Sequence, residues 1–85
     1  MKHASHPGIT ARLKRAIGHL NSVVAMIEDD RSCIDLAQQL HAVEKAVGGA
    51  KRELIHDHIE HCLDDGDRAR TKASLKELKQ LAKYL

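Results

Sequence analysis

Residues 32–62 read SCIDLAQQLHAVEKAVGGAKRELIHDHIEHC, with apolar side chains at the three- and four-residue spacing of one helix face. The spacing continues in phase across Gly48 and Gly49, although each glycine costs about 1 kcal/mol relative to alanine inside a helix. Ser32, followed three residues later by Asp35, is typical of a helix N-terminus. The pattern therefore predicts one long helix, in which the two glycines mark close packing or a slight bend.

Two shorter helical stripes flank this stretch, one over residues 9–27 and one over residues 75–82. No segment alternates as a strand would, and no run of about 18 apolar residues is present to cross a membrane. The sequence predicts an all-α fold with three helices per chain. Residues 1–8 are expected to form a flexible N-terminal tail, and residues 9–85 a single domain.

The composition indicates that one copy of this chain is marginally stable alone. The chain has 85 residues, no Trp, no Phe and a single Tyr, so its core must be built from smaller apolar side chains. Small domains of this kind usually need a metal, a disulfide or another subunit. The polar N-terminus has no signal-peptide character, which predicts a cytoplasmic protein. In that compartment the two cysteines are expected to be metal ligands or reactive thiols.

Positive charge is concentrated at the start of the chain. The first twenty residues hold four basic side chains and no acidic one, namely Lys2, Arg12, Lys14 and Arg15. Such a cluster is the electrostatic footprint of a phosphate-binding face, although a solvated helix face carries the same charge. The charge pattern is therefore compatible with nucleic-acid binding without requiring it.

Cys33, His58 and Cys62 are the candidate metal ligands. His58 and Cys62 are four residues apart and share a helix face, where thiolate and imidazole suit Cu(I), Zn(II), Ni(II) or Co(II). Cys33 is about 37 Å away along the same helix. The three can meet only if two copies of the helix pair antiparallel, giving two sites in a two-fold dimer. Alternatively, the cysteines are small apolar residues of the stripe.

Other histidines surround this candidate site. His3 and His6 in the tail could fold over it as extra ligands, and His61 could lie beside the ligands. An enzyme with a Cys–His pair is disfavoured, because no glycine-rich phosphate loop is present and a short helical chain leaves little room for a substrate. A redox or sulfur-species sensor and a metal-buffering module remain as alternatives.

The segments 12–20, 32–33, 38–43 and 57–62 resemble the CsoR/RcnR family of metal-sensing transcriptional repressors. The resemblance covers about residues 9 to 84. It implies an antiparallel homodimer with a four-helix core, and a dimer of dimers as the homotetramer. It also implies that apo protein binds GC-tract operator DNA and is released when inducer binds, which derepresses metal efflux or resistance genes.

The resemblance assigns roles by position. Three residues match the metal ligands: Cys33, His58 and Cys62. Four match or adjoin basic DNA-facing positions: Arg12, Lys14, Arg15 and Arg52. Glu77 falls near the position of a glutamate that, in the copper sensors, contacts a metal-binding side chain rather than the metal ion itself.

Two departures bear on the inducer and the operator. Ser32 stands where copper sensors often have Tyr, and Ile17 stands where a family arginine is common. Cu(I) and Ni(II) both fit the ligand pattern, the latter with His3 or His6 as a further nitrogen donor, and Co(II) or Zn(II) remain possible. The alternative is a persulfide- or redox-sensing repressor that uses both cysteines, although His58 argues against it.

Overall fold

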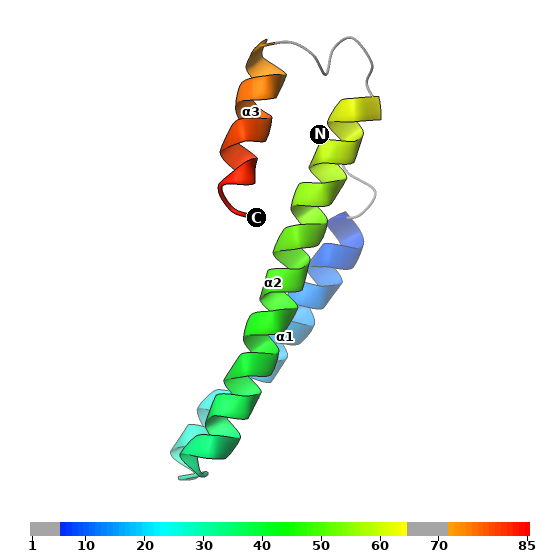
Figure 1. Ribbon diagram of the computed structural model, residues 1–85. Helices are drawn as coiled ribbons and strands as arrows, with labels where there is room; N and C mark the ends of the chain where they lie inside the picture. Colours follow the sequence, from blue (N-terminus) through cyan, green and yellow to red (C-terminus); the bar gives the residue numbers. More distant parts are fainter. Residues whose placement is uncertain (1–5, 65–71) are drawn as a thin grey trace.

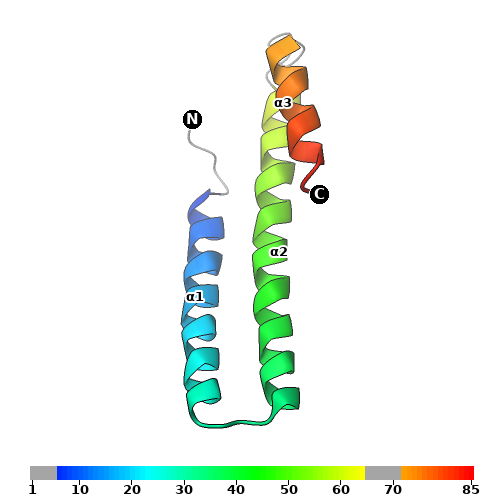
Figure 2. The ribbon, with the colours of Figure 1, turned by 90° about the vertical axis from the view of Figure 1, so that its left-hand side faces the viewer.

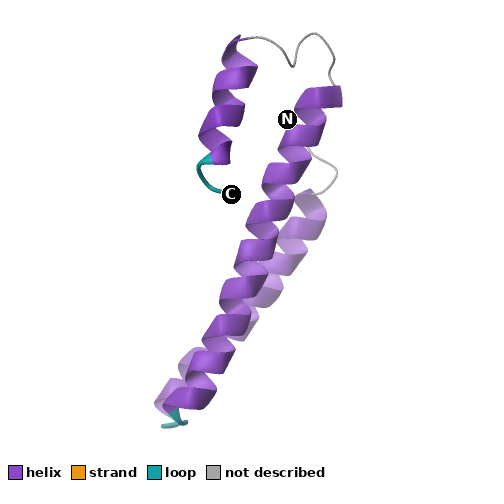
Figure 3. Ribbon diagram, in the orientation of Figure 1, coloured by secondary structure: helices purple, strands orange, loops and turns teal. Residues whose placement is uncertain are grey.

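A computed structural model describes residues 6–64 and 72–85; the side chains of residues 62–64 and 72–74 lie outside this description. Three helices are present: α1 (His6–Glu28), α2 (Cys33–Asp64) and α3 (Lys72–Ala82). Within the described ranges every regular element is helical, as Figure 3 shows. The predicted all-α class and the single long central helix are confirmed.

The three helices lie in one layer. Helices α1 and α2 run side by side as an antiparallel hairpin, and α3 packs against the C-terminal half of α2 on the side away from α1 (Figures 1 and 2). The molecule measures 56 × 23 × 13 Å, so its thinnest dimension is close to the diameter of one helix. Because a single layer cannot enclose a core, both broad faces of the hairpin are open.

The core is correspondingly narrow. On α1 only residues seven apart are buried, and they form a single ridge against α2. The buried apolar residues are Ile9, Ala16, Val23, Val43, Ala50 and Ile55. None of them is aromatic, so the area removed from water in one chain is small.

Much of the predicted apolar stripe remains exposed beside this ridge. One hollow between α1 and α2 is lined by Leu13, Ala16, Ile17, Leu20, Val43 and Val47. A second is lined by Ile9, Leu13, Val47, Ala50, Lys51 and Leu54. The two hollows share Leu13 and Val47 and therefore form one apolar groove along the hairpin. Leu13, Leu20 and Val47 are each 38–46% exposed in this apolar groove.

The α1–α2 connection is built from local backbone signals. Arg31 N–H donates to Met26 C=O and Asp30 N–H donates to Ile27 C=O, which is the Schellman pattern for ending a helix. Asp30 takes the left-handed conformation that this motif requires, with φ 55°. Helix α2 then starts at once, because Ser32 Oγ accepts a hydrogen bond of 3.1 Å from Asp35 N–H. The predicted cap at Ser32 is confirmed.

Replacing Asp30 with glycine is expected to stabilise the protein by about 0.5–1 kcal/mol. Glycine adopts a left-handed backbone more readily than Asp does, and the change removes one negative charge from the negative end of the α1 dipole. Thermal unfolding followed by circular dichroism should show a midpoint raised by about 2–6 °C. Asp29→Gly removes the same charge at a position without positive φ. An equal gain in that control would show that charge, and not backbone conformation, is responsible.

Helix α1 begins at His6, three residues earlier than the sequence pattern indicates. Pro7 falls in the first turn, where its missing N–H is not needed and its fixed φ suits a helix. Residues 6–8, which were assigned to the tail, therefore belong to the helix, and residues 1–5 lie outside the described part of the chain. None of the described helices is long and apolar enough to cross a membrane.

Candidate functional site

The predicted metal ligands lie far apart within one chain. Cys33 is the first residue of α2, and its thiol is exposed and not in a disulfide. His58 lies 25 residues further along the same helix, about 37 Å away at 1.5 Å per residue. Among the described residues of one chain, no three His, Cys, Asp or Glu side chains come together as a metal site would require. A site that uses both Cys33 and His58 therefore needs a second chain.

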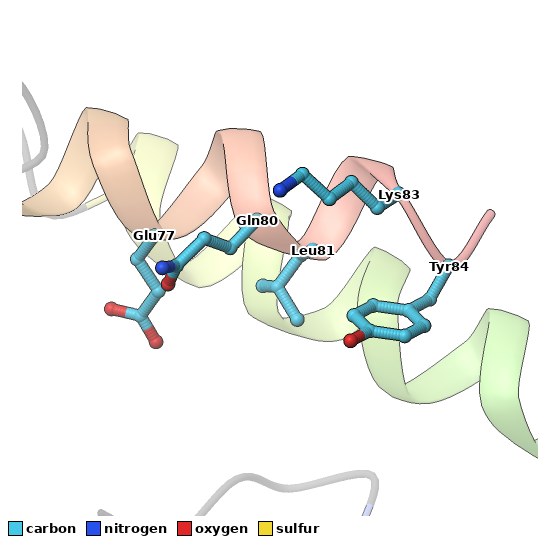
Figure 4. A pocket seen from close by; sticks show the side chains of 5 residues that line it. All are labelled: Glu77, Gln80, Leu81, Lys83 and Tyr84. Atoms are coloured by element: carbon cyan, nitrogen blue, oxygen red, sulfur yellow. The ribbon is translucent and has the colours of Figure 1, made fainter.

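His58 is held at the junction of α2 and α3. Its Nε2 lies 3.1 Å from Glu77 Oε1, within ion-pair distance. The imidazole is only 19% exposed, whereas Glu77 is 55% exposed. Figure 4 shows Glu77 and Leu81 projecting from one side of α3, and Lys83 extending along another. The carboxylate is thus placed to orient the imidazole ring, as carboxylates beside metal-binding histidines do.

The apolar groove lies along the middle of α2, between Val43 and Leu54. Cys33, Leu40, Val47 and Leu54 are each seven residues apart, so they lie along one line of the helix. Val47 and Leu54 line the apolar groove, and His58 follows Leu54 by one turn on the same side. A second helix that lies in this groove and extends along α2 past both of its ends would therefore face Cys33 at one end and His58 at the other.

The other predicted ligand residues are only partly described. His3 lies outside the described residues, as does the side chain of Cys62, whose backbone belongs to α2. His6 is the first residue of α1 and is half-buried. His61 lies in the last turn of α2 and is also half-buried. The roles of these four residues stay predictions.

Two of the predicted DNA-facing residues come together on the hairpin. A Cβ atom built on Gly49 would lie 3.7 Å from Arg12 Nη1 and 3.8 Å from Arg52 Nη2. A Cβ atom on Gly48 would lie 3.5 Å from Arg52 Nη1. The guanidinium groups of α1 and α2 therefore converge over the two glycines, which leave the backbone open beneath them. We call these four residues the arginine pair and its glycine floor.

The other two predicted DNA-facing residues both belong to α1. Lys14 and Arg15 are exposed on α1. Their side chains can extend to a large charged partner without rearranging the hairpin. The glycines approach only the tips of flexible side chains, so close packing inside one chain does not account for them.

Sequence reasoning missed two contacts between α1 and α2. Glu53 Oε2 lies 3.0 Å from Arg12 Nη1, and His19 Nε2 lies 2.6 Å from Gln39 Oε1. Both pairs join residues twenty or more positions apart. Their partners follow from the register of the hairpin, and neither residue stands out by type or spacing in the sequence.

Comparison with known proteins places the chain in a family. Residues 5–84 match the family described as metal-sensitive transcriptional repressor. The copper-sensing transcriptional repressor CsoR of Mycobacterium ulcerans is 38% identical over 77 residues, which cover 86% of this chain and 63% of that protein. The repressors of the same name from Mycobacterium tuberculosis and Bacillus subtilis are 35% and 40% identical, over 86% and 67% of this chain and 62% and 56% of their own lengths.

The chain thus spans 56–63% of the length of these relatives. No solved structure matches it significantly. The relatives are regulators of transcription rather than enzymes. The family match extends over all three helices, including Cys33, His58 and the arginine pair. The chain therefore belongs to the family of metal-sensitive transcriptional repressors.

Proposed function

We propose that this protein is a copper-responsive repressor, which binds operator DNA in its apo form and leaves it when Cu(I) binds between two subunits. The observation that carries the proposal is the position of Cys33 and His58 at opposite ends of one line along α2, with the apolar groove between them. An antiparallel second copy in this groove would bring Cys33 of one chain to His58 and Cys62 of the other. The exposed apolar side chains supply the reason for the two copies to associate.

The donor set fits the proposed ion. Two cysteine thiols and one imidazole are soft to borderline ligands, which suit Cu(I) better than they suit Mg²⁺ or Ca²⁺. The exposed thiol of Cys33 is available at the N-terminal end of α2, and Glu77 is close enough to the ring of His58 to orient it. The relatives named above are copper sensors, which favours Cu(I) over Ni(II), Co(II) and Zn(II), and over persulfide, as the inducer.

The arginine pair supports the DNA-binding half of the proposal. Arginine presents a planar fork of N–H donors that matches phosphate oxygens, and two such groups converge over the glycine floor. Lys14 and Arg15 on the same hairpin would add further phosphate contacts. A dimer of dimers would present several such surfaces to one GC-rich operator, and such a role would place the protein with the DNA in the cytoplasm.

Release of the operator follows if Cu(I) and DNA bind preferentially to different arrangements of the dimer. Binding at a shared site would tie the start of one α2 to the end of the partner's α2 and, through Glu77, to α3. DNA requires the arginine pairs of the subunits to keep a fixed spacing. Because coupling is reciprocal, an ion that binds the DNA-free arrangement more tightly weakens DNA binding by the same factor. About 3 kcal/mol of coupling would lower operator affinity more than a hundredfold.

The proposal is tested by fluorescence anisotropy of labelled GC-tract operator DNA, titrated with apo protein without oxygen. We expect tight binding by the apo protein and release by one equivalent of Cu(I) per protomer, with no release by Ni(II). Release by Ni(II) alone would correct the inducer and leave the repressor role. Binding that neither ion changes, but that persulfide abolishes, would establish the sulfur-sensing alternative. Absence of apo binding would refute the repressor role itself.

A further inference from the structure

The arginine pair has a carboxylate built into its edge. Glu53 Oε2 lies 3.0 Å from Arg12 Nη1, while the Arg12 and Arg52 guanidinium groups converge over the glycine floor. The side chains of Arg12 and Glu53 are 45% and 40% exposed, so a ligand approaching Arg12 from solvent also approaches Glu53. The carboxylate therefore occupies one of the positions at which a phosphate oxygen would accept a hydrogen bond from Arg12.

The sign of the surface charge changes at Glu53. A shallow hollow on α2 is lined by Arg52, Glu53, His56, Asp57 and Glu60. Moving along α2 towards its C-terminus, this surface passes from the arginine pair to three carboxylates. A polyanion lying over Arg12 and Arg52 would meet repulsion as soon as it extended past Glu53.

We infer that Glu53 is a built-in competitor of DNA phosphate at Arg12. The inference rests on the proposed operator-binding function and adds to it a residue that limits the affinity and the extent of the contact. In the DNA-free protein the carboxylate holds Arg12 in place over Gly49. When DNA binds, a phosphate either displaces the carboxylate from Arg12 or shares the Arg12 guanidinium with it. In both cases the carboxylate is left beside the polyanion.

The internal ion pair makes DNA binding weaker and less salt-dependent than the arginine pair alone would. A guanidinium already neutralised by Glu53 releases fewer counterions from DNA on contact, because the displaced carboxylate has to attract a cation of its own. An exposed ion pair of this type is weak, so phosphate can win the competition. Glu53 is thus a positioning residue for Arg12 and sets the strength of the contact from which the inducer must release the protein.

The decisive variant is Glu53→Gln in the full chain, which keeps the side-chain shape and removes the charge. Its matched control is Glu28→Gln, which removes the same charge at the exposed C-terminal end of α1, far from the arginine pair. Operator binding is measured by anisotropy at several salt concentrations. We expect Glu53→Gln to tighten apo binding about 3- to 10-fold near 0.1 M salt and to steepen the log–log salt slope by about 1 for each protomer that contacts DNA. Glu28→Gln should change affinity less than twofold.

A second background separates competition from a general charge effect. In Arg12→Gln protein, adding Glu53→Gln should tighten operator binding clearly less than it does in wild type, because only repulsion of the polyanion is left to relieve. An equal or larger tightening without Arg12, or weaker binding by Glu53→Gln, would overturn the inference. Equal binding by wild type, Glu28→Gln and Glu53→Gln would also overturn it while the proposed function stands. Failure of all three proteins to bind would refute the proposed function.

Discussion

Cys33→Ala should abolish release of the operator by Cu(I) while apo DNA binding changes less than twofold. Cys33 is exposed at the start of α2 and lies outside the buried core, so its loss removes a ligand without opening a cavity. Loss of one thiolate from a three-donor site should weaken metal binding by at least about 10³-fold, since the remaining two donors cannot satisfy the ion. Anaerobic competition with a Cu(I) chelator measures the affinity, and operator anisotropy measures release. Release that survives in Cys33→Ala would exclude the proposed site.

Mixed dimers test whether the site is shared between subunits. Neither Cys33→Ala nor His58→Ala protein alone can form a complete site. In a dimer with one chain of each kind, Cys33 of one subunit meets His58 and Cys62 of the other at one of the two positions. We therefore expect tight Cu(I) binding to return at about half an equivalent per protomer. A site built within one chain would give no recovery, and the distance between Cys33 and His58 along α2 already disfavours it.

The sequence was sufficient to predict the features that depend on local signals. The cap at Ser32 depends only on neighbouring residues, because it acts through a hydrogen bond to Asp35 N–H three positions away. The in-phase stripe correctly indicated a continuous α2 through Gly48 and Gly49, because propensity is a weak term against helical packing. The start of α1 at His6 was missed, since Pro7 suits a first turn as well as a tail.

Contacts between helices could not be predicted in the same way. The pairing of Arg12 with Glu53 depends on the register of the hairpin, which is set by the buried ridge and the length of the turn. His58 and Glu77 stand on either side of residues 65–71 in the sequence, and these residues lie outside the described part of the chain. The family resemblance indicated that Glu77 lies near the site, but the 3.1 Å separation of Glu77 Oε1 from His58 Nε2 depends on how α3 packs on α2. The sequence pattern also did not show that only the edge of the α1 stripe is buried within one chain.

The exposed part of that stripe leads to the second large effect: Leu20→Glu should break the protein into monomers that no longer bind operator DNA. Leu20 lines the apolar groove and is 44% exposed, so a single chain can keep its fold with a charged residue there. In the proposed dimer the Leu20 side chains of both subunits are buried at the interface. Because each Leu20 is 44% exposed in a single chain, burying the rest of both side chains contributes about 1–3 kcal/mol to the dimer, and the desolvation of two carboxylates adds several kcal/mol to the cost of the substitution.

Sedimentation velocity and circular dichroism distinguish this outcome from unfolding. We expect Leu20→Glu to sediment as a monomer at concentrations where wild type is oligomeric, with at least a hundredfold increase in the dimer dissociation constant and helicity largely kept at low temperature. Ala25→Glu places the same charge at an exposed position of α1 that does not line the groove, and it should sediment as wild type does. If both variants stay oligomeric, the copies associate through another surface, and Cys33 and His58 would not be brought together by the apolar groove. If only Leu20→Glu dissociates and also fails to bind Cu(I) tightly, oligomer assembly and the metal site depend on the same apolar groove.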